Sequence, residues 1–295
     1  MKKSTVFIKG GFGNQLFQLS FAHFLKQNKF KVDINTKFLK DDGYNTPRRL
    51  ILPLDLFGFK EQNFISKNIF NIFERINRSN KFKKTFSFMS DYKFSTDKEN
   101  IFTENKNRFF FNGYWKDLNY INPTKEIIIE SLSKNLIIKN GFEESYDNKT
   151  ALIHVRRGDF LRDERQLNIS YYEKSLDYMR SQNINKLHVF TDDKDWVLNQ
   201  KLFESVEKIV TQKSGNEKKF VERGINSIDD KEETIKTFSS MLKYNNFVLS
   251  NSSFSFWAAF LKSTIKSKVT IPDPMFRNEE RKNIYLENWK LIINE

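Results

Sequence analysis

Cysteine is absent from the 295-residue sequence, and histidine occurs only three times. Without cysteine the chain can form no disulfide bond and no zinc or iron–sulfur site built on thiolates. Three histidines are also too few for a histidine-rich metal centre. The composition therefore excludes these metal sites, and a cytoplasmic location, where thiols stay reduced, fits it.

Long apolar runs are also missing. No stretch approaches the roughly 20 apolar residues that a membrane-spanning helix needs. The first residues, "MKKSTVFIKGG", include a basic pair, but no apolar run of the length found in signal peptides follows. We expect a soluble protein, or one that associates with a membrane from its surface.

Basic residues outnumber acidic ones, with 50 Lys and Arg against 37 Asp and Glu, a net charge of +13 and a pI of about 9.5. Such a charge occurs in proteins that bind nucleic acid, in proteins that rest on anionic lipid and in enzymes for phosphorylated substrates. Here the lysines are scattered, and only short clusters such as "KFKK" at 81–84 occur. This distribution argues against nucleic acid as a partner.

The chain is long enough for two domains, since domains usually contain about 100–200 residues. Hydrophobic residues make up 38% of it, with 31 Phe among the aromatic residues, which is ample for two cores. The apolar run at 5–8 predicts a strand, apolar residues recur at helical spacing from 16 to 25, and 30–35 predicts a second strand. The chain thus begins as a βαβ unit.

The second half alternates in the same way. Apolar runs predict strands at 151–155, 187–190, 247–250 and 268–272. Helical periodicity predicts helices at 125–137, 171–181, 231–245 and 251–262, and a polar segment at 139–150 predicts a linker. We therefore predict an α/β protein of two Rossmann-like domains, residues 1–145 and 146–295, with a last helix packed back on the N-terminal domain.

Four loops follow predicted strands at their carboxyl ends, where open α/β sheets bind ligands. They are "GGFGNQ" at 10–15, "HVRRGD" at 154–159, "TDD" at 191–193 and "SNSSFSF" at 250–256. Their agreement is a stronger signal than any one of them, and together they predict an active site.

The glycine loop begins like a dinucleotide-binding motif, with Gly11-Phe-Gly13 and with Asp33 at the distance of a ribose-binding acid. Leu16 stands where the third small residue belongs, which disfavours that interpretation. Two others stay open: a tight turn that needs a positive φ, or a loop that lets a ligand approach a helix N-terminus. For the second, the candidate ligand contacts are Gly11, Gly13, Asn14 and Gln15.

Arg156 and Arg157 are adjacent at the end of a buried strand. One interpretation is an ion-pair network in which Asp159 or a neighbouring acid neutralises an arginine. The other is that planar guanidinium groups bind phosphate oxygens. Two fixed cations could then stabilise a departing diphosphate without a metal. His154 beside them is either a ligand of nucleotide or sugar, or structural.

The remaining two loops offer polar side chains. Ser252 and Ser253 stand at a helix start, where one of them is expected to cap the helix. The same helix N-terminus, including the backbone of Phe254, is a candidate anion site. The run "TDDKD" at 191–195 resembles a D-x-D metal motif, but we interpret Asp192 or Asp193 as a base or a ribose hydrogen-bonding group, with a solvated loop acid as the alternative.

With "GGFGNQLFQ", "HVRRGDF", "FTDD" and "SNSSFSFWAAFL" in this order and spacing, the sequence resembles the α-1,2-fucosyltransferases of glycosyltransferase family 11. The resemblance covers both ends of the chain and most of the second half, and is loose over 41–140. It departs from the family at Phe160, where Tyr is usual, and at Leu19-Ser20, where Tyr-Ala is common. Neither change affects the proposed phosphate ligands.

The resemblance implies a GT-B fold, with two facing Rossmann-like domains and the active site in the cleft. It implies GDP-fucose as the donor, bound by the C-terminal domain, inversion at the anomeric carbon, and no essential metal or other cofactor. By likeness to related fucosyltransferases, Arg157 is the main β-phosphate contact. Asp159 is the first candidate for the catalytic base, His154 the second and Glu164 the third.

The expected acceptor is a galactose-terminated oligosaccharide or lipid-linked glycan of a bacterial surface polysaccharide of the O-antigen type, fucosylated at its 2-OH. The basic charge would then hold the enzyme at the anionic inner face of the plasma membrane. The alternatives are a transferase for another GDP-sugar or linkage, and a basic nucleic-acid-binding α/β protein. The last predicts binding without turnover and a steep dependence on salt.

Overall fold

The computed structural model describes residues 1–40, 48–62, 72, 92–95, 107–162, 164–211, 230–276 and 283–294, with the backbone only at Lys40, 92–95, Asp159 and Arg162. The chain divides into two compact units, Met1–Ser131 and Leu132–Glu295. The basic cluster at 81–84 lies outside the described residues. Among those that are described, no helix is both long and apolar enough to cross a membrane.

The N-terminal unit is built on a parallel sheet with strand order β2-β1-β4-β3. The strands are β1 (Lys3–Phe7), β2 (Lys31–Asn35), β3 (Tyr92–Ser95) and β4 (Arg108–Phe111). The helical segments are α1 (Phe12–Gln27), α2 (Lys37–Lys40), η1 (Leu54–Phe57), α5 (Leu118–Ile121), η3 (Asn122–Thr124) and α6 (Lys125–Ser133). The predicted βαβ beginning is confirmed.

The C-terminal unit has a second parallel sheet, with order β10-β9-β8-β5-β6-β7. Its strands are β5 (Thr150–Val155), β6 (Lys186–Thr191), β7 (Lys208–Thr211), β8 (Asn246–Val248), β9 (Val269–Asp273) and β10 (Lys290–Ile293). Its helical segments are α7 (Leu136–Glu143), α8 (Gly158–Arg162), α9 (Ile169–Ser181), α10 (Lys194–Leu198), η4 (Lys201–Phe203), α12 (Lys231–Met241) and α13 (Ser253–Lys262). The α/β class is confirmed.

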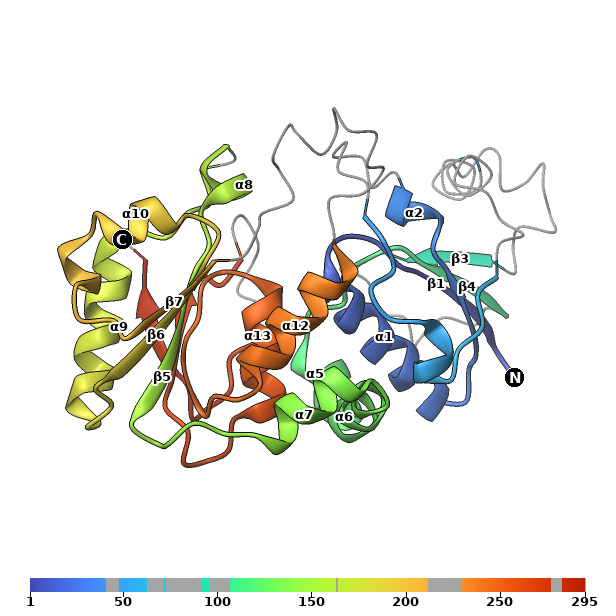
Figure 1. Cartoon of the computed structure of the whole chain (residues 1–295). Coiled ribbons are helices and arrows are strands. Elements are labelled where there is room, and N and C mark those ends of the chain that lie inside the picture. The colour runs from blue at the N-terminus through green and yellow to red at the C-terminus, as the bar shows by residue number, and fades with distance from the viewer. Residues whose placement is uncertain are drawn as a thin grey trace. The chain divides into compact units, whose positions relative to one another are not determined.

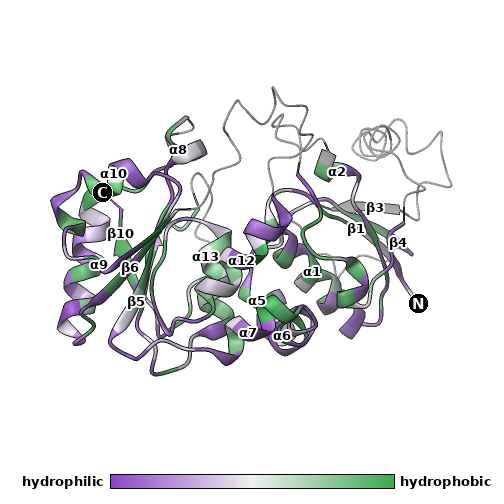
Figure 2. Ribbon diagram, in the orientation of Figure 1, coloured by the Kyte–Doolittle hydropathy of each residue, from purple (hydrophilic) through white to green (hydrophobic). Residues whose placement is uncertain are grey.

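Helices cover both faces of this sheet, with α9 and α10 on one side and α12 and α13 on the other (Figure 1). Successive residues of a strand face opposite sides. Ile153 and Val189 accordingly belong to the core cluster shared with Leu176 of α9. Because both faces are covered, β5 is buried along its whole length. The helix α9 carries hydrophobic residues on its sheet side and hydrophilic residues elsewhere (Figure 2).

The segment predicted as a linker at 139–150 is partly helical. The helix α6 ends at Ser133, and Asn135 caps α7, since its side chain accepts hydrogen bonds from the backbone N–H groups of Ile137 and Ile138. Gly141, which lies within this predicted linker, is a contact residue: a Cβ there would lie 2.4 Å from the carbonyl oxygen of Ser239 on α12. Glycine thus permits the close packing of α7 on α12, and the boundary between the units falls before α7 rather than between 145 and 146.

The C-terminus also differs from expectation. The last described element is strand β10, paired with β9 inside the C-terminal unit, and not a helix packed on the N-terminal domain. The four-residue strands β3, β4, β7 and β10 were not predicted from the sequence.

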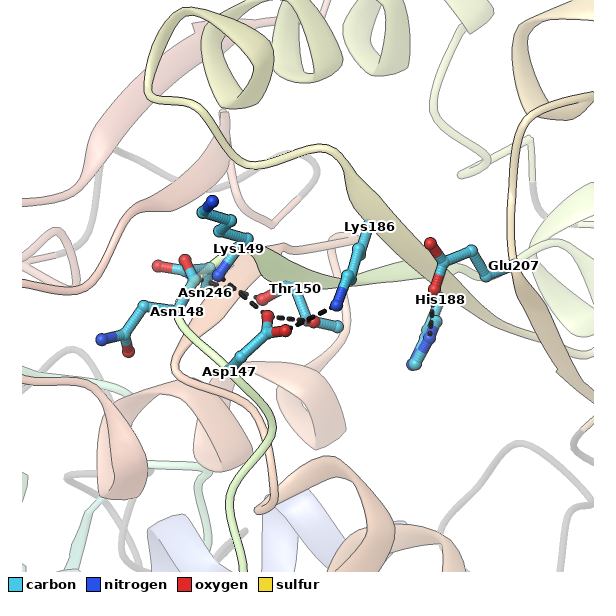
Figure 3. A network of polar contacts seen from close by, with 8 residues as sticks. All are labelled: Asp147, Asn148, Lys149, Thr150, Lys186, His188, Glu207 and Asn246. Carbon is cyan, nitrogen blue, oxygen red and sulfur yellow. Dashed lines mark hydrogen bonds and ion pairs between the residues drawn. The ribbon is translucent and has the colours of Figure 1, made fainter.

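A polar network joins the amino-terminal ends of the strands in the C-terminal unit (Figure 3). Asp147 accepts hydrogen bonds from the Thr150 hydroxyl at 2.7 Å and the Lys149 N–H at 3.0 Å, and pairs with Lys186 at 2.7 Å. On the next strand pair, the Asn246 amide donates to the Thr150 carbonyl at 3.1 Å. These contacts fix the strand starts at the edge opposite the predicted site.

Candidate active site

The strand order of the C-terminal sheet reverses between β5 and β8. The chain runs outward from β5 through β6 to β7, and then returns to the other side of β5 with β8, β9 and β10. Ligands of open α/β sheets bind at the carboxyl ends of the strands at such a point. The loops after β5, β6 and β8 are those predicted from the sequence, so the fold brings these three together at one edge.

Arg156 is paired with Asp192. Val155 and Thr191 are register partners at the ends of β5 and β6, so the residues that follow each are neighbours. The Arg156 Nη1 lies 2.8 Å from Asp192 Oδ2, and the Asp192 side chain is 0% exposed. Asp192 Oδ1 also accepts the Arg157 N–H at 2.8 Å. Asp192 therefore binds the side chain of Arg156 and the backbone of Arg157. The ion pair with Arg156 is one of the interactions expected of an ion-pair network.

Arg157 is held through one edge of its guanidinium group. Its Nε donates to Asp193 Oδ2 at 3.1 Å, and its Cζ lies 4.1 Å from the centre of the Trp196 ring. Within the described part of the chain, this is the only hydrogen bond of the Arg157 side chain. The two Nη atoms thus remain available as a fork for a bidentate anion. The Arg157 side chain is 17% exposed.

His154 and Ser250 connect the two strands that flank the switch point. His154 Nδ1 and Ser250 Oγ are 2.7 Å apart, and both residues are buried. Below them, the Tyr172 hydroxyl donates to the His154 carbonyl at 3.4 Å. Burial raises the pKa of Tyr172 well above its usual value. These contacts favour the structural interpretation of His154, one of the two alternatives left open by the sequence.

Ser252 is the N-cap of α13, since its hydroxyl accepts the Phe254 N–H at 3.3 Å. That bond commits the Phe254 N–H to the helix, while the Phe254 ring packs on Phe238 at 5.4 Å. Ser253, the half-buried first residue of α13, is then the stronger candidate for a ligand contact in this turn. The predicted capping role of a serine here is confirmed.

Asp159 lies in α8, and its side chain is outside the described residues. Glu164, the third candidate base, is exposed and has a φ of 51°. Between them, Phe160 is buried, with the Arg156 Cζ at 5.6 Å and the Arg165 Cζ at 4.3 Å from its ring centre. An aromatic residue at 160 therefore orders the arginines that surround it, and this ring role needs no tyrosine hydroxyl.

In the N-terminal unit, the glycine loop turns from β1 into α1. Gly10 has a φ of 75°, a left-handed backbone conformation that explains why glycine stands at this position. Gly11 is the N-cap of α1 without a side-chain cap, and a Cβ there would meet no atom within 4 Å. Gly13 is buried in the first turn, and Asn14 Oδ1 has no hydrogen-bond partner among the described residues. The loop therefore offers a helix N-terminus and an amide to a ligand.

Gln15 is not placed as a ligand contact. Its Nε2 donates to the carbonyl oxygens of Gly10 at 3.0 Å and Arg49 at 2.8 Å, and its Oε1 accepts the Ile51 N–H at 3.1 Å. Both amide donors are thus used inside the unit, and the side chain is buried. These bonds give Gln15 a role in positioning the glycine loop against residues 49–51, and its contact with a ligand stays a prediction.

Two residues that shape these loops were missed from the sequence. Gln18 accepts the Lys9 N–H at 3.0 Å and donates to the Gly113 carbonyl at 3.0 Å, which ties the loop after β1 to the loop after β4. Trp196 stacks on Arg157. The sequence showed a glutamine one turn after Gln15 and a tryptophan after "TDD". It did not show which residues these two side chains contact, because those contacts form only in the folded protein.

Parallel sheets with arginines at a switch point are typical of α/β enzymes that bind phosphorylated ligands. The sequence matches glycosyl transferase family 11 over residues 2–293. The chain therefore belongs to this family of glycosyltransferases, as its motifs predicted.

Two relatives from Escherichia coli are similar over nearly their whole length. One, an alpha-1,2-colitosyltransferase, is 26% identical over 290 residues, covering 92% of this chain and 92% of the relative. The other, the O-antigen biosynthesis glycosyltransferase WbnK, is 24% identical over 325 aligned positions, covering 96% of this chain and 98% of that protein.

Solved structures are more distant. The NodZ alpha-1,6-fucosyltransferase soaked with GDP-fucose aligns with a TM-score of 0.47 and 11% identity, over 89% of this chain and 92% of that chain. The heptosyltransferase WaaC from E. coli with ADP aligns with a TM-score of 0.42 and 9% identity, over 99% and 93%. At these scores the family assignment depends on the sequence match.

Proposed function

We propose that this glycosyltransferase transfers L-fucose from GDP-β-L-fucose to the 2-OH of a terminal galactoside, with inversion and without a metal. The observation that carries the proposal is the Arg157 guanidinium group, held through Nε by Asp193 with its two Nη atoms available. A fork of this kind fits the oxygens of a diphosphate. Membership in family 11 supplies the reaction class.

In this reaction the acceptor oxygen attacks the anomeric carbon in line, while the bond from that carbon to the β-phosphate oxygen breaks. The electron pair of the broken bond goes to GDP, and Arg157 with the N-terminus of α13 stabilises the added charge. The acceptor hydroxyl loses its proton to a carboxylate or an imidazole. Asp159 remains our first candidate, because His154 is buried and bonded to Ser250.

We assign the donor to the C-terminal unit and the acceptor to the N-terminal unit. The acceptor class is a galactose-terminated or lipid-linked glycan in O-antigen synthesis, which the name of one relative supports. We also propose that the enzyme acts in the cytoplasm at the anionic inner membrane surface, and the net charge of +13 supports such an association.

A second candidate is transfer of a colitosyl residue in the same α-1,2 linkage. It is favoured by the 26% identity to the alpha-1,2-colitosyltransferase. Both candidates use the same arginine site and differ only in the sugar.

The test is a donor panel in EDTA, with GDP-fucose, a colitosyl donor and GDP-mannose offered to a β-galactoside acceptor. We expect turnover with GDP-fucose and an α-1,2-linked product by NMR. Turnover with the colitosyl donor alone would select the second candidate. Release of GDP from GDP-mannose but not from GDP-fucose would overturn the proposal, and loss of turnover in EDTA would overturn its metal-free part.

A further inference from the structure

Trp196 lies in the short helix α10, directly after the loop that carries the two site aspartates. Its indole ring is stacked near the Arg157 guanidinium group, with the Arg157 Cζ 4.1 Å from the ring centre. A planar guanidinium group over an aromatic face is attracted by the ring quadrupole and is restricted in its rotation. Trp196 therefore contacts the one arginine that the proposed function requires to be oriented.

Asp193 connects the helix to the arginine. Its Oδ1 accepts the Trp196 N–H at 3.1 Å and caps α10, while its Oδ2 accepts the Arg157 Nε at 3.1 Å. Its own N–H donates to Thr191 Oγ1 at 3.0 Å, at the end of β6. One carboxylate thus fixes both the start of α10 and one edge of the guanidinium group.

The Trp196 ring is itself supported from the core. Its centre lies 6.1 Å from that of Phe203 and 6.4 Å from that of Tyr172, both of which are buried. These rings belong to the cluster that packs α9 against the sheet, and Trp196 packs against that cluster. The Trp196 ring is therefore held in place by its contacts with buried aromatic rings.

We infer that Trp196 is a positioning residue which, together with Asp193, holds the Arg157 guanidinium group so that its two Nη atoms face a bound diphosphate. The inferred role of Trp196 rests on the proposed function of Arg157, whereas the contacts between the two side chains do not depend on any ligand. It also assigns Asp193 to orientation of the arginine rather than to the base or ribose role expected from the sequence.

The first experiment needs no ligand. In the whole protein labelled with nitrogen-15, the Arg157 Nε–H signal should exchange slowly and be shifted by the indole ring current. Trp196→Leu should move the signal, and Asp193→Asn should accelerate its exchange. Tyr178→Leu is the matched control, because it removes a partly buried aromatic ring of α9 from the edge of the same cluster and leaves Phe203 and Tyr172, which support Trp196, in place. An Arg157 signal unchanged in both test variants would overturn the positioning role.

The second experiment measures GDP binding and transfer in a double-mutant cycle. Trp196→Leu should weaken GDP binding and turnover roughly 3- to 30-fold, as expected for loss of a partly buried cation–π contact. Trp196→Phe should restore most of the loss. In an Arg157→Ala background, Trp196→Leu should have no further effect. Independent losses that multiply would overturn the inference, whereas a wild-type protein that binds no GDP would overturn the proposed function and leave the NMR test decisive.

Discussion

The two edges of the C-terminal sheet use similar side chains under opposite conditions. At the carboxyl edge the Asp192 side chain is 0% exposed and its partner Arg156 is 20% exposed. At the amino edge Asp147 is 50% exposed and Lys186 is 48% exposed. Water screens the second pair, so it contributes little, whereas the first pair carries a desolvation cost that only fixed geometry offsets. Burial, rather than the number of ion pairs, therefore distinguishes the edge where side-chain orientation matters.

The largest effect is expected from Asp192→Ala. This change leaves Arg156 without its buried carboxylate and the Arg157 N–H without its acceptor, so we expect a loss of about 3–5 kcal/mol in the free energy of unfolding. Urea unfolding measures it. Asp147→Ala at the amino edge is the matched control and should cost far less. Equal losses at the two edges would show that burial does not distinguish them.

Arg157→Lys should affect function without a comparable effect on folding. Lysine keeps the charge but has no fork and no planar face for Trp196, so turnover should fall by about 10²–10³. Donor-saturated transfer rates and urea unfolding of the same sample separate the two effects. The control is Arg180→Lys on α9, where the arginine is 45% exposed and pairs with Asp177 at 3.3 Å. Turnover retained by Arg157→Lys would refute the bidentate role.

The carboxyl edge was largely predictable because its signals are local. The apolar run of β5, the serine cap of α13 and the arginine pair could each be identified from a few adjacent residues. The ion-pair partners could not. Which acid meets which arginine depends on the pairing of Val155 with Thr191, and β-register is a property of two strands distant in the sequence.

Other features depended on packing that no local pattern reveals. Gly141 looked like a loop residue, but its role is the close approach of α7 to α12. Gln15 looked like a ligand contact next to two glycines, but its bonds to Arg49 and Ile51 reach a segment far along the chain. The amino-edge network was not predicted either, because its members come from separate strand starts (Figure 3).

At the amino edge, His188 should make stability depend on pH. Burial lowers its pKa and nearby Lys208 lowers it further, although Glu207 acts in the opposite direction. Below about pH 6.5 the unfolded chain then binds a proton that the folded protein resists, so stability falls as the pH falls. The slope from one proton is at most about 1.4 kcal/mol per pH unit.

The measurement is the free energy of unfolding of wild type and His188→Gln between pH 7.5 and 5.5. Glutamine can still bond to the Tyr244 hydroxyl, which lies 2.7 Å from His188 Nδ1, but it does not titrate in this range. The difference between the two proteins should therefore change with pH in favour of the variant on acidification. Parallel curves would mean that His188 is not the group responsible.

The smallest effect is expected at Asp147, the exposed counterpart of Asp192. Its hydrogen bonds to Lys186 and Thr150 lower its pKa to about 2. A lowered pKa means that the folded state favours the carboxylate, so the stabilisation is complete above about pH 4 and disappears as the pH falls toward 2. Unfolding of wild type and Asp147→Asn should thus differ slightly at pH 6, and the difference should shrink at pH 3 and in high salt. A difference as large as that of Asp192→Ala, or one that grows in acid, would contradict the contrast between a screened edge and a buried one.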